Sequence, residues 1–124
     1  MRRLAILVAG LAFAGAMPAQ AAAPLSRVQV VAVEFHYRLS RVRVPAGQVR
    51  IELANFGQDE HDLRLRRIGG SRVYHLQSAL PGQRQTLNAR LAPGLYRLKC
   101  TLADHAARGM RAELRVRPRT QPRR

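Results

Sequence analysis

The chain has 124 residues, of which 47% are hydrophobic, and 22 Lys and Arg against 7 Asp and Glu give it a formal net charge of +15. This length suits one small domain with a single core and is too short for a two-domain enzyme. The single cysteine, Cys100, excludes an internal disulfide framework. The hydrophobic content is too high for a disordered basic tail.

Residues 1–21 have the three-part layout of a secretory signal peptide. Two arginines follow Met1, an apolar run covers 4–16, and an A-x-A cleavage signal covers 19–21. The apolar run is short for a bilayer span, so cleavage is favoured over the alternative of an uncleaved membrane anchor. The sequence therefore predicts export to the periplasm and a mature chain of residues 22–124.

From residue 22 onward the pattern is that of short strands separated by turns. Residues 22–27 are expected to be a flexible lead-in, and 118–124 a basic, disordered tail. Residues 75–80 could hold one short turn of helix. The predicted strands, which are rich in β-branched or alternating apolar residues, cover 28–35, 38–44, 49–55, 61–66, a weaker run around 73–74, 85–91, 95–100 and 110–117.

Several short strands with turn signals at regular intervals predict one all-β domain over residues 28–117. The turn signals are Pro45-Ala46-Gly47, Gly69-Gly70, Pro81-Gly82 and Pro93-Gly94. No stretch of the mature chain has helical periodicity over three turns. The fold class indicated is an antiparallel β-sandwich.

Strand alternation accounts for much of the arginine. Arginines occupy the polar phase of their strands, so they are expected to face water while the aliphatic residues between them face the core. The alternative is a functional one, in which the charge steers the protein toward an acidic partner or an anionic membrane surface. The arginines concerned are Arg41, Arg43, Arg64, Arg66, Arg111, Arg115 and Arg117.

So basic a composition also suggests a nucleic-acid-binding protein. Export argues against that class, because a protein of the cell envelope rarely meets nucleic acid. The excess positive charge remains a hypothesis about which partner the protein meets, and no nucleic-acid partner is expected.

Four residues with metal-binding side chains stand out. Cys100, His105 and Met110 follow the spacing Cys-x4-His-x4-Met, and His61 lies at the start of another strand. Cys100 ends one predicted strand and Met110 opens the next, so the loop between them can bring these side chains together. Two imidazoles and one thiolate with a weak axial thioether are the ligand set of a blue-copper electron-transfer site.

Each of these residues also has a simpler interpretation. A lone cysteine is usually a buried, inert residue, and His61 could be an ordinary surface histidine. The spacing of histidine and methionine after the cysteine favours copper ligation. The other histidines, His36 and His75, are expected at the surface. The acidic cluster Asp59, Glu60 and Asp62 is expected to be a solvated loop, with tuning of the copper potential as the alternative.

These features resemble a cupredoxin, the type 1 blue-copper family of plastocyanin, azurin and their bacterial relatives. The loop from Cys100 to Met110, with Gly109 before the methionine, is the specific match. Asn55-Phe56-Gly57 ahead of His61 is a moderately specific one. Weaker matches follow in the family's order and extend the resemblance over nearly the whole mature chain: 33–37, 44–47, 80–82 and 92–96.

The resemblance implies a Greek-key β-sandwich that binds one type 1 copper ion and transfers single electrons. Cys100 would be the thiolate ligand, His61 and His105 the imidazole ligands, and Met110 the axial ligand. Asn55 resembles the asparagine that holds the loop before the first histidine. His105 would lie at the patch through which electrons enter or leave.

The first hypothesis is therefore a monomeric electron carrier of the periplasm whose partner is an acidic redox protein, such as a cytochrome, an oxidase or a reductase. Peripheral contact with an anionic membrane surface is compatible with it. The alternatives are a copper-binding or copper-delivery module without an electron-carrier role, and a basic binding module in which the sandwich is only a scaffold. A stand-alone enzyme is not expected, because the chain has no His-x-His pair and only one cysteine.

Overall fold

The computed structural model describes residues 15–120, which fold into nine strands and contain no helix. Residues 1–14 of the predicted signal peptide and 121–124 of the predicted tail lie outside this range. None of the described residues forms a helix that is long and apolar enough to cross a membrane. The strands are β1 (Ser26–Val33), β2 (His36–Leu39), β3 (Arg43–Pro45), β4 (Gly47–Asn55), β5 (His61–Arg67), β6 (Val73–Ala79), β7 (Arg84–Leu91), β8 (Gly94–Lys99) and β9 (Arg111–Arg117).

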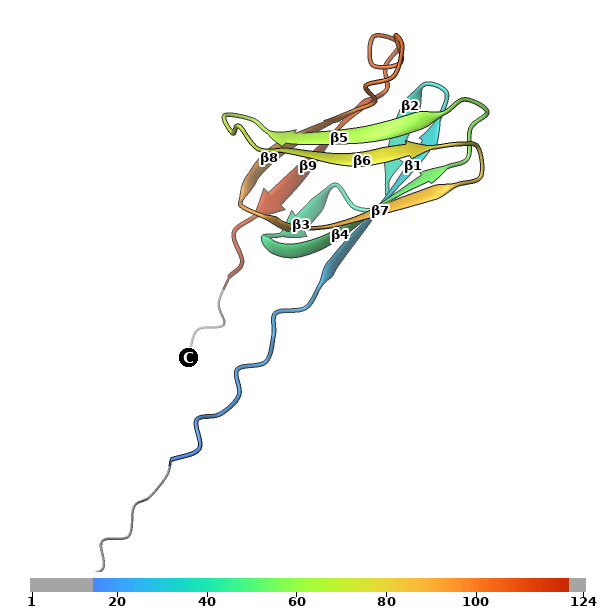
Figure 1. Ribbon diagram of the computed structural model, residues 1–124. Helices are drawn as coiled ribbons and strands as arrows, with labels where there is room; N and C mark the ends of the chain where they lie inside the picture. Colours follow the sequence, from blue (N-terminus) through green and yellow to red (C-terminus); the bar gives the residue numbers. More distant parts are fainter. Residues whose placement is uncertain (1–14, 121–124) are drawn as a thin grey trace, which may run out of the picture.

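Two sheets pack face to face, which confirms the predicted all-β sandwich (Figure 1). One sheet has four strands in the order β2-β1-β4-β7, and the other has five in the order β3-β9-β8-β5-β6. Alternate residues of each strand fill the space between the sheets, as in Ile51 and Leu53 of β4 or Leu63 and Leu65 of β5, all fully buried. Aliphatic burial of this kind provides most of the stability of such a fold.

The expectation of purely antiparallel pairing is wrong at two places. β1 runs parallel to β4, and β3 runs parallel to β9, so both sheets are mixed. Between β1 and β4 the chain passes through β2 and then β3, which belongs to the other sheet. A strand that returns to its sheet after such a crossover enters from the same end as before, and therefore pairs in parallel.

The predicted strand 38–44 is in fact two strands in different sheets. The backbone N–H of Ser40 donates to Gln29 O at the open end of the β1–β2 hairpin, whereas Val42 O accepts from the N–H of Arg115 on β9. The segment between them carries the chain from one sheet to the other, which leaves Val42 exposed. Alternation of residue types cannot reveal such a switch, because both halves keep the extended backbone.

The predicted helical turn at 75–80 is also wrong, since β6 is a strand to Ala79. Leu76 and Ala79 are both buried although they are three residues apart, a spacing that suggests a helix. Their partners on β5 are Leu63 and His61, which are only two residues apart. The extra residue on β6 is a β-bulge, which brings both side chains to the inner face.

Candidate metal centre

Figure 1 shows the loop that projects between β8 and β9 at one end of the sandwich. Three of the four predicted ligands belong to this loop, and the fourth, His61, lies beside it. His61 is the first residue of β5, Cys100 directly follows β8, and Met110 directly precedes β9. His105 lies midway along the loop. All four residues are buried.

Three of the donor atoms converge on one point. His61 Nδ1 lies 3.3 Å from His105 Nδ1, and that nitrogen lies 3.6 Å from Cys100 Sγ. One ligand atom from each residue falls within 4.8 Å of the other two. Nitrogen and sulfur ligands placed ~2.0–2.3 Å from a common ion are separated by roughly 3.3–3.8 Å at trigonal to tetrahedral angles. The site therefore fits a single metal ion bound by two imidazoles and one thiolate.

Met110 belongs to the same end of the fold. Its backbone carbonyl accepts from the N–H of Cys100 at 3.2 Å, and its own N–H donates to His105 O at 3.0 Å. These two bonds close the loop at its base, and the side chain of Met110 is fully buried. Its role as an axial ligand stays a prediction.

The loop itself is tightly curled by local backbone hydrogen bonds. The N–H groups of His105, Arg108 and Gly109 donate to the carbonyls of Leu102, Asp104 and Ala106. Gly109 has a φ of +114°, a conformation that L side chains rarely adopt. This requirement explains why a glycine stands directly before Met110.

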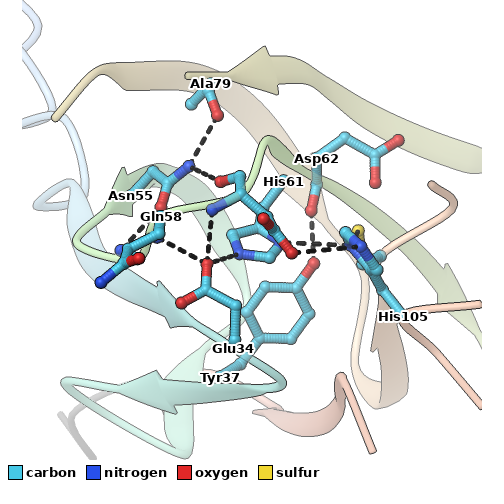
Figure 2. Close-up of polar contacts among 11 residues, drawn as sticks. Glu34, Tyr37, Asn55, Gln58, His61, Asp62, Ala79 and His105 are labelled. Carbon is cyan, nitrogen blue, oxygen red and sulfur yellow. Dashed lines mark hydrogen bonds and ion pairs between the residues drawn. The ribbon is translucent and has the colours of Figure 1, made fainter. Parts of the chain in front are cut away.

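Asn55 fixes the loop that leads into His61 (Figure 2). Its side-chain amide donates to Asp59 O at 2.7 Å and to Ala79 O at 2.8 Å, while its oxygen accepts from the N–H of Gly57 at 2.8 Å. Asn55 is itself buried. One side chain thus ties the turn after β4 to the end of β6, in the role that the sequence suggests for it.

Replacing Asn55 with alanine is expected to lower the free energy of unfolding of the metal-free protein by about 1–2 kcal/mol, because buried backbone groups lose their partners. Urea denaturation of the two proteins measures this difference. The exposed Asn88 of β7 offers the matched control, and Asn88→Ala should change the stability by no more than about 0.5 kcal/mol. Equal losses in both variants would contradict the role given to Asn55.

Glu34 is a site residue that sequence analysis does not identify. Its Oε1 lies 2.9 Å from His61 Nε2 and accepts from the backbone N–H groups of Gln58 and Asp59 at 2.7 Å each (Figure 2). These bonds, that of Asp59 foremost, lower the pKa of the Glu34 carboxyl to about 2. Because an ionised carboxylate only accepts, Nε2 of His61 must carry a proton, and in the neutral imidazole Nδ1 then has its lone pair toward the site.

A glycine makes room for this carboxylate. A Cβ added to Gly57 would lie 2.2 Å from the Oε1 of Glu34, which is far too close. The glycine in Asn55-Phe56-Gly57 therefore lets the carboxylate reach the backbone of the loop. Its presence was a sequence signal for a close approach at this position, although the sequence could not identify the approaching group.

The expectation that Asp62 belongs to a solvated loop is wrong. Asp62 is buried, and its carboxylate accepts from the backbone N–H of Thr101 at 2.6 Å, from the Thr101 hydroxyl and from His75 Nε2 at 2.8 Å. Burial opposes ionisation of this carboxyl, but these bonds outweigh it and lower the pKa of Asp62. The carboxylate thus fixes the chain next to Cys100. Asp59 and Glu60 are exposed, as expected for a loop.

Tyr37 completes the buried side of the site. Its hydroxyl donates to the backbone carbonyl of Asp62 (Figure 2). Burial, above all, raises the pKa of both the Tyr37 phenol and the Cys100 thiol. The metal-free protein therefore holds Cys100 as a neutral thiol, and a metal ion that binds it must displace the proton.

His105 lies on the outer side of the site, where it is only 8% exposed. The Phe35 ring packs against its imidazole with 5.0 Å between centroids, and the Arg108 guanidinium lies 4.5 Å from the centroid of the Phe35 ring. Asp59 Oδ2 is 4.0 Å from His105 Nε2. The imidazole edge thus approaches the surface between an aromatic ring and an acid.

The two remaining histidines take no part in the cluster. His36 is exposed on β2. His75 lies on β6, with a side chain 51% exposed, and pairs with Asp62. Both positions agree with the expectation that these histidines lie at the surface.

No family model and no curated protein matches the chain. Solved structures do. Auracyanin A, a "blue" copper protein from Chloroflexus aurantiacus, is 16% identical and superposes with a TM-score of 0.61 over 75% of this chain and 99% of its own. Rusticyanin from Thiobacillus ferrooxidans is 14% identical, with a TM-score of 0.63 over 77% and 79%. The copper nitrite reductase of Nitrosomonas europaea is 20% identical, with a TM-score of 0.59, over 77% of this chain but 42% of its own. At these identities the similarity establishes the fold.

Proposed function

We propose that this chain, which has the cupredoxin fold, is an exported electron carrier that binds one type 1 copper ion through His61, Cys100 and His105, with Met110 as the axial ligand. The observation that carries the proposal is the convergence of three buried donor atoms, two imidazole nitrogens and one thiol sulfur, at the spacing of ligands to one ion. The likeness to auracyanin A and rusticyanin supports it.

The chemistry of the donors favours copper over other ions. Thiolate and imidazole ligands also suit zinc, but two imidazoles and one thiolate with a weak axial thioether together are the ligand set of blue copper. When bound, the copper ion would supply a one-electron redox couple. The thiolate of Cys100 would donate charge strongly to it, as in other blue-copper sites.

The residues around the site hold the ligands in place before any metal arrives. Glu34 fixes the orientation and the tautomer of His61, Asp62 holds the backbone of Thr101 next to Cys100, and the bonds at the base of the loop fix Met110. Ligands held in this way move little when the charge on the site changes. A small rearrangement on electron transfer is what a carrier requires.

Two routes are proposed for the electron, the edge of His105 and the end of β8, where Lys99 directly precedes Cys100. The His105 imidazole is the candidate ligand nearest the surface, whereas His61 is completely buried. The buried side, lined by Tyr37 and Asp62, keeps water from Cys100. The partner in this proposal is a second redox protein.

We infer export from the sequence of residues 1–21, with cleavage after Ala21 and function as a monomer in the periplasm. Mass spectrometry of protein purified from the periplasm would identify the first residue of the mature chain. A stand-alone copper enzyme is not proposed. His36 and His75, the only other histidines of the sequence, belong to different sheets, and the sequence has a single cysteine.

Copper loading tests the proposed function. The protein with Cu(II) is expected to turn intensely blue and to be bleached and restored reversibly by a reductant and an oxidant, because the thiolate of Cys100 is bound directly to the ion. Absorption and electron paramagnetic resonance spectroscopy measure this. A protein that binds Cu(II) but stays colourless would refute the proposal. A blue protein that exchanges electrons only slowly, yet passes Cu(I) to an acceptor protein, would favour a copper-delivery module instead.

A further inference from the structure

We propose that the outer face of the five-stranded sheet docks an acidic redox protein, an inference that rests on the proposed electron-carrier function. This surface, the cationic face, consists of five basic side chains that point away from the core. They are Arg64 and Arg66 on β5, Arg97 and Lys99 on β8, and Arg111 on β9.

Strand register brings these side chains together in two rows. Arg64 lies directly opposite Lys99, which lies opposite Arg111 on its other side. Arg66 lies opposite Arg97 in the next row. Like charges directly opposite each other destabilise a sheet, so the first row costs stability. In the second row Glu113 lies opposite Arg97 on its other side. We attribute the cost of the first row to binding.

The cationic face is not neutralised by the chain's own acids. Within residues 15–120 none of its five side chains forms an ion pair. An open groove of about 640 Å³ passes over the face, and Glu113 is the one acidic residue that lines it. The groove therefore presents five positive charges of the cationic face against a single negative one.

The chain's other acids gather at the metal end instead. Five of its seven Asp and Glu residues lie in or beside the segments that carry the candidate ligands. These residues are Glu34, Asp59, Glu60, Asp62 and Asp104. The end of the molecule near His105 therefore mixes acidic side chains with Arg108, and it attracts an acidic partner less than the cationic face does.

The cationic face is also close to the candidate site along the chain. Lys99 directly precedes Cys100, and Arg111 directly follows Met110. A protein bound over the first row would therefore lie one residue away from two of the proposed ligands. This proximity favours a redox protein as the occupant. A lipid bilayer is the less suitable occupant, because a flat surface meets only the rims of a groove.

Chemical-shift mapping tests the proposal with poly-L-glutamate as the acidic polypeptide. The probe is titrated at low ionic strength into ¹⁵N-labelled protein, both metal-free and loaded with Cu(I). Shifts are expected in β5, β8 and β9. The triple variant R66Q/R97Q/K99Q should bind at least about tenfold more weakly, whereas the charge-matched R27Q/R38Q/R90Q, altered on the four-stranded sheet, should change the affinity by less than about threefold.

Three results would overturn the proposal. Shifts centred on the four-stranded sheet or on the loop around His105 would place the docking surface elsewhere. Equal weakening of both triple variants would mean that only net charge matters. Vesicles of phosphatidylglycerol and phosphatidylcholine that bind the cationic face more tightly than poly-L-glutamate would assign it to a membrane. Because the metal-free protein is included, failure of copper binding is distinguished from failure of docking.

Discussion

Cys100→Ser is expected to abolish the blue colour of the copper-loaded protein and to lower its affinity for copper by more than about a hundredfold. Loss of a residue that is hydrogen-bonded to a metal ligand already lowers the affinity for the metal by about 10–100-fold. Loss of the ligand itself must lower it further. Serine has nearly the shape of cysteine but offers a hard hydroxyl, which stays protonated at neutral pH and does not replace a thiolate. Optical titration with copper against a competing chelator measures both effects.

Two controls separate this result from a loss of structure. His75→Gln changes a metal-binding side chain that is half-exposed and outside the cluster, and it should keep the colour. The metal-free Cys100→Ser protein should unfold in urea close to the wild type, because the substitution changes little volume. A blue Cys100→Ser protein would contradict the assignment of the thiolate ligand.

Glu34→Ala is expected to lower the affinity for copper by about a hundredfold, and Glu34→Gln by about tenfold, the two ends of the range for outer partners of ligating histidines. Alanine leaves the buried Nε2–H of His61 without its acceptor, whereas glutamine keeps a neutral acceptor and loses only the charge. Titration of each protein with copper in competition with a chelator gives the affinities. The essential part of the prediction is that the affinity for copper rises from Glu34→Ala to Glu34→Gln to the wild type.

A second measurement follows the tautomer of His61 without any metal. The ¹⁵N chemical shifts of the imidazole should indicate a proton on Nε2 in the wild type and a mixture of tautomers in Glu34→Ala. Glu60→Gln is the matched control, because Glu60 is exposed and pairs with Ser78 rather than with a histidine. If Glu34→Ala bound copper as tightly as Glu60→Gln does, the carboxylate would have no positioning role.

Local sequence patterns predicted most of the strands and the position of the site. The clean alternation of residues 49–55 and 61–66 corresponds to β4 and β5, each extended by one or two residues. The spacing from Cys100 to Met110 predicted a closed loop, and its two ends do adjoin neighbouring antiparallel strands, β8 and β9. These features are encoded within a few residues of one another, so sequence reasoning could reach them.

Features that depend on contacts between distant segments were missed. Glu34 is 27 residues from His61, and nothing in its own neighbourhood indicates that the β1–β2 turn passes beside the loop before β5. Asp62 follows His61 in an alternating strand, which suggests that its side chain faces water. The bulge between β5 and β6, together with Thr101 and His75, encloses it instead. Burial of a carboxylate by partners from other strands leaves no local pattern.

The pleat of β8 and β9 has a consequence for how this protein can change over evolution. Cys100 and Met110 are buried, while their neighbours Lys99 and Arg111 are exposed and face each other across the two strands. Mutations at the exposed pair can therefore alter which molecules the surface attracts while the buried pair is preserved. Selection can act separately on the proposed recognition surface and on the proposed metal ligands, although these residues are adjacent in the gene.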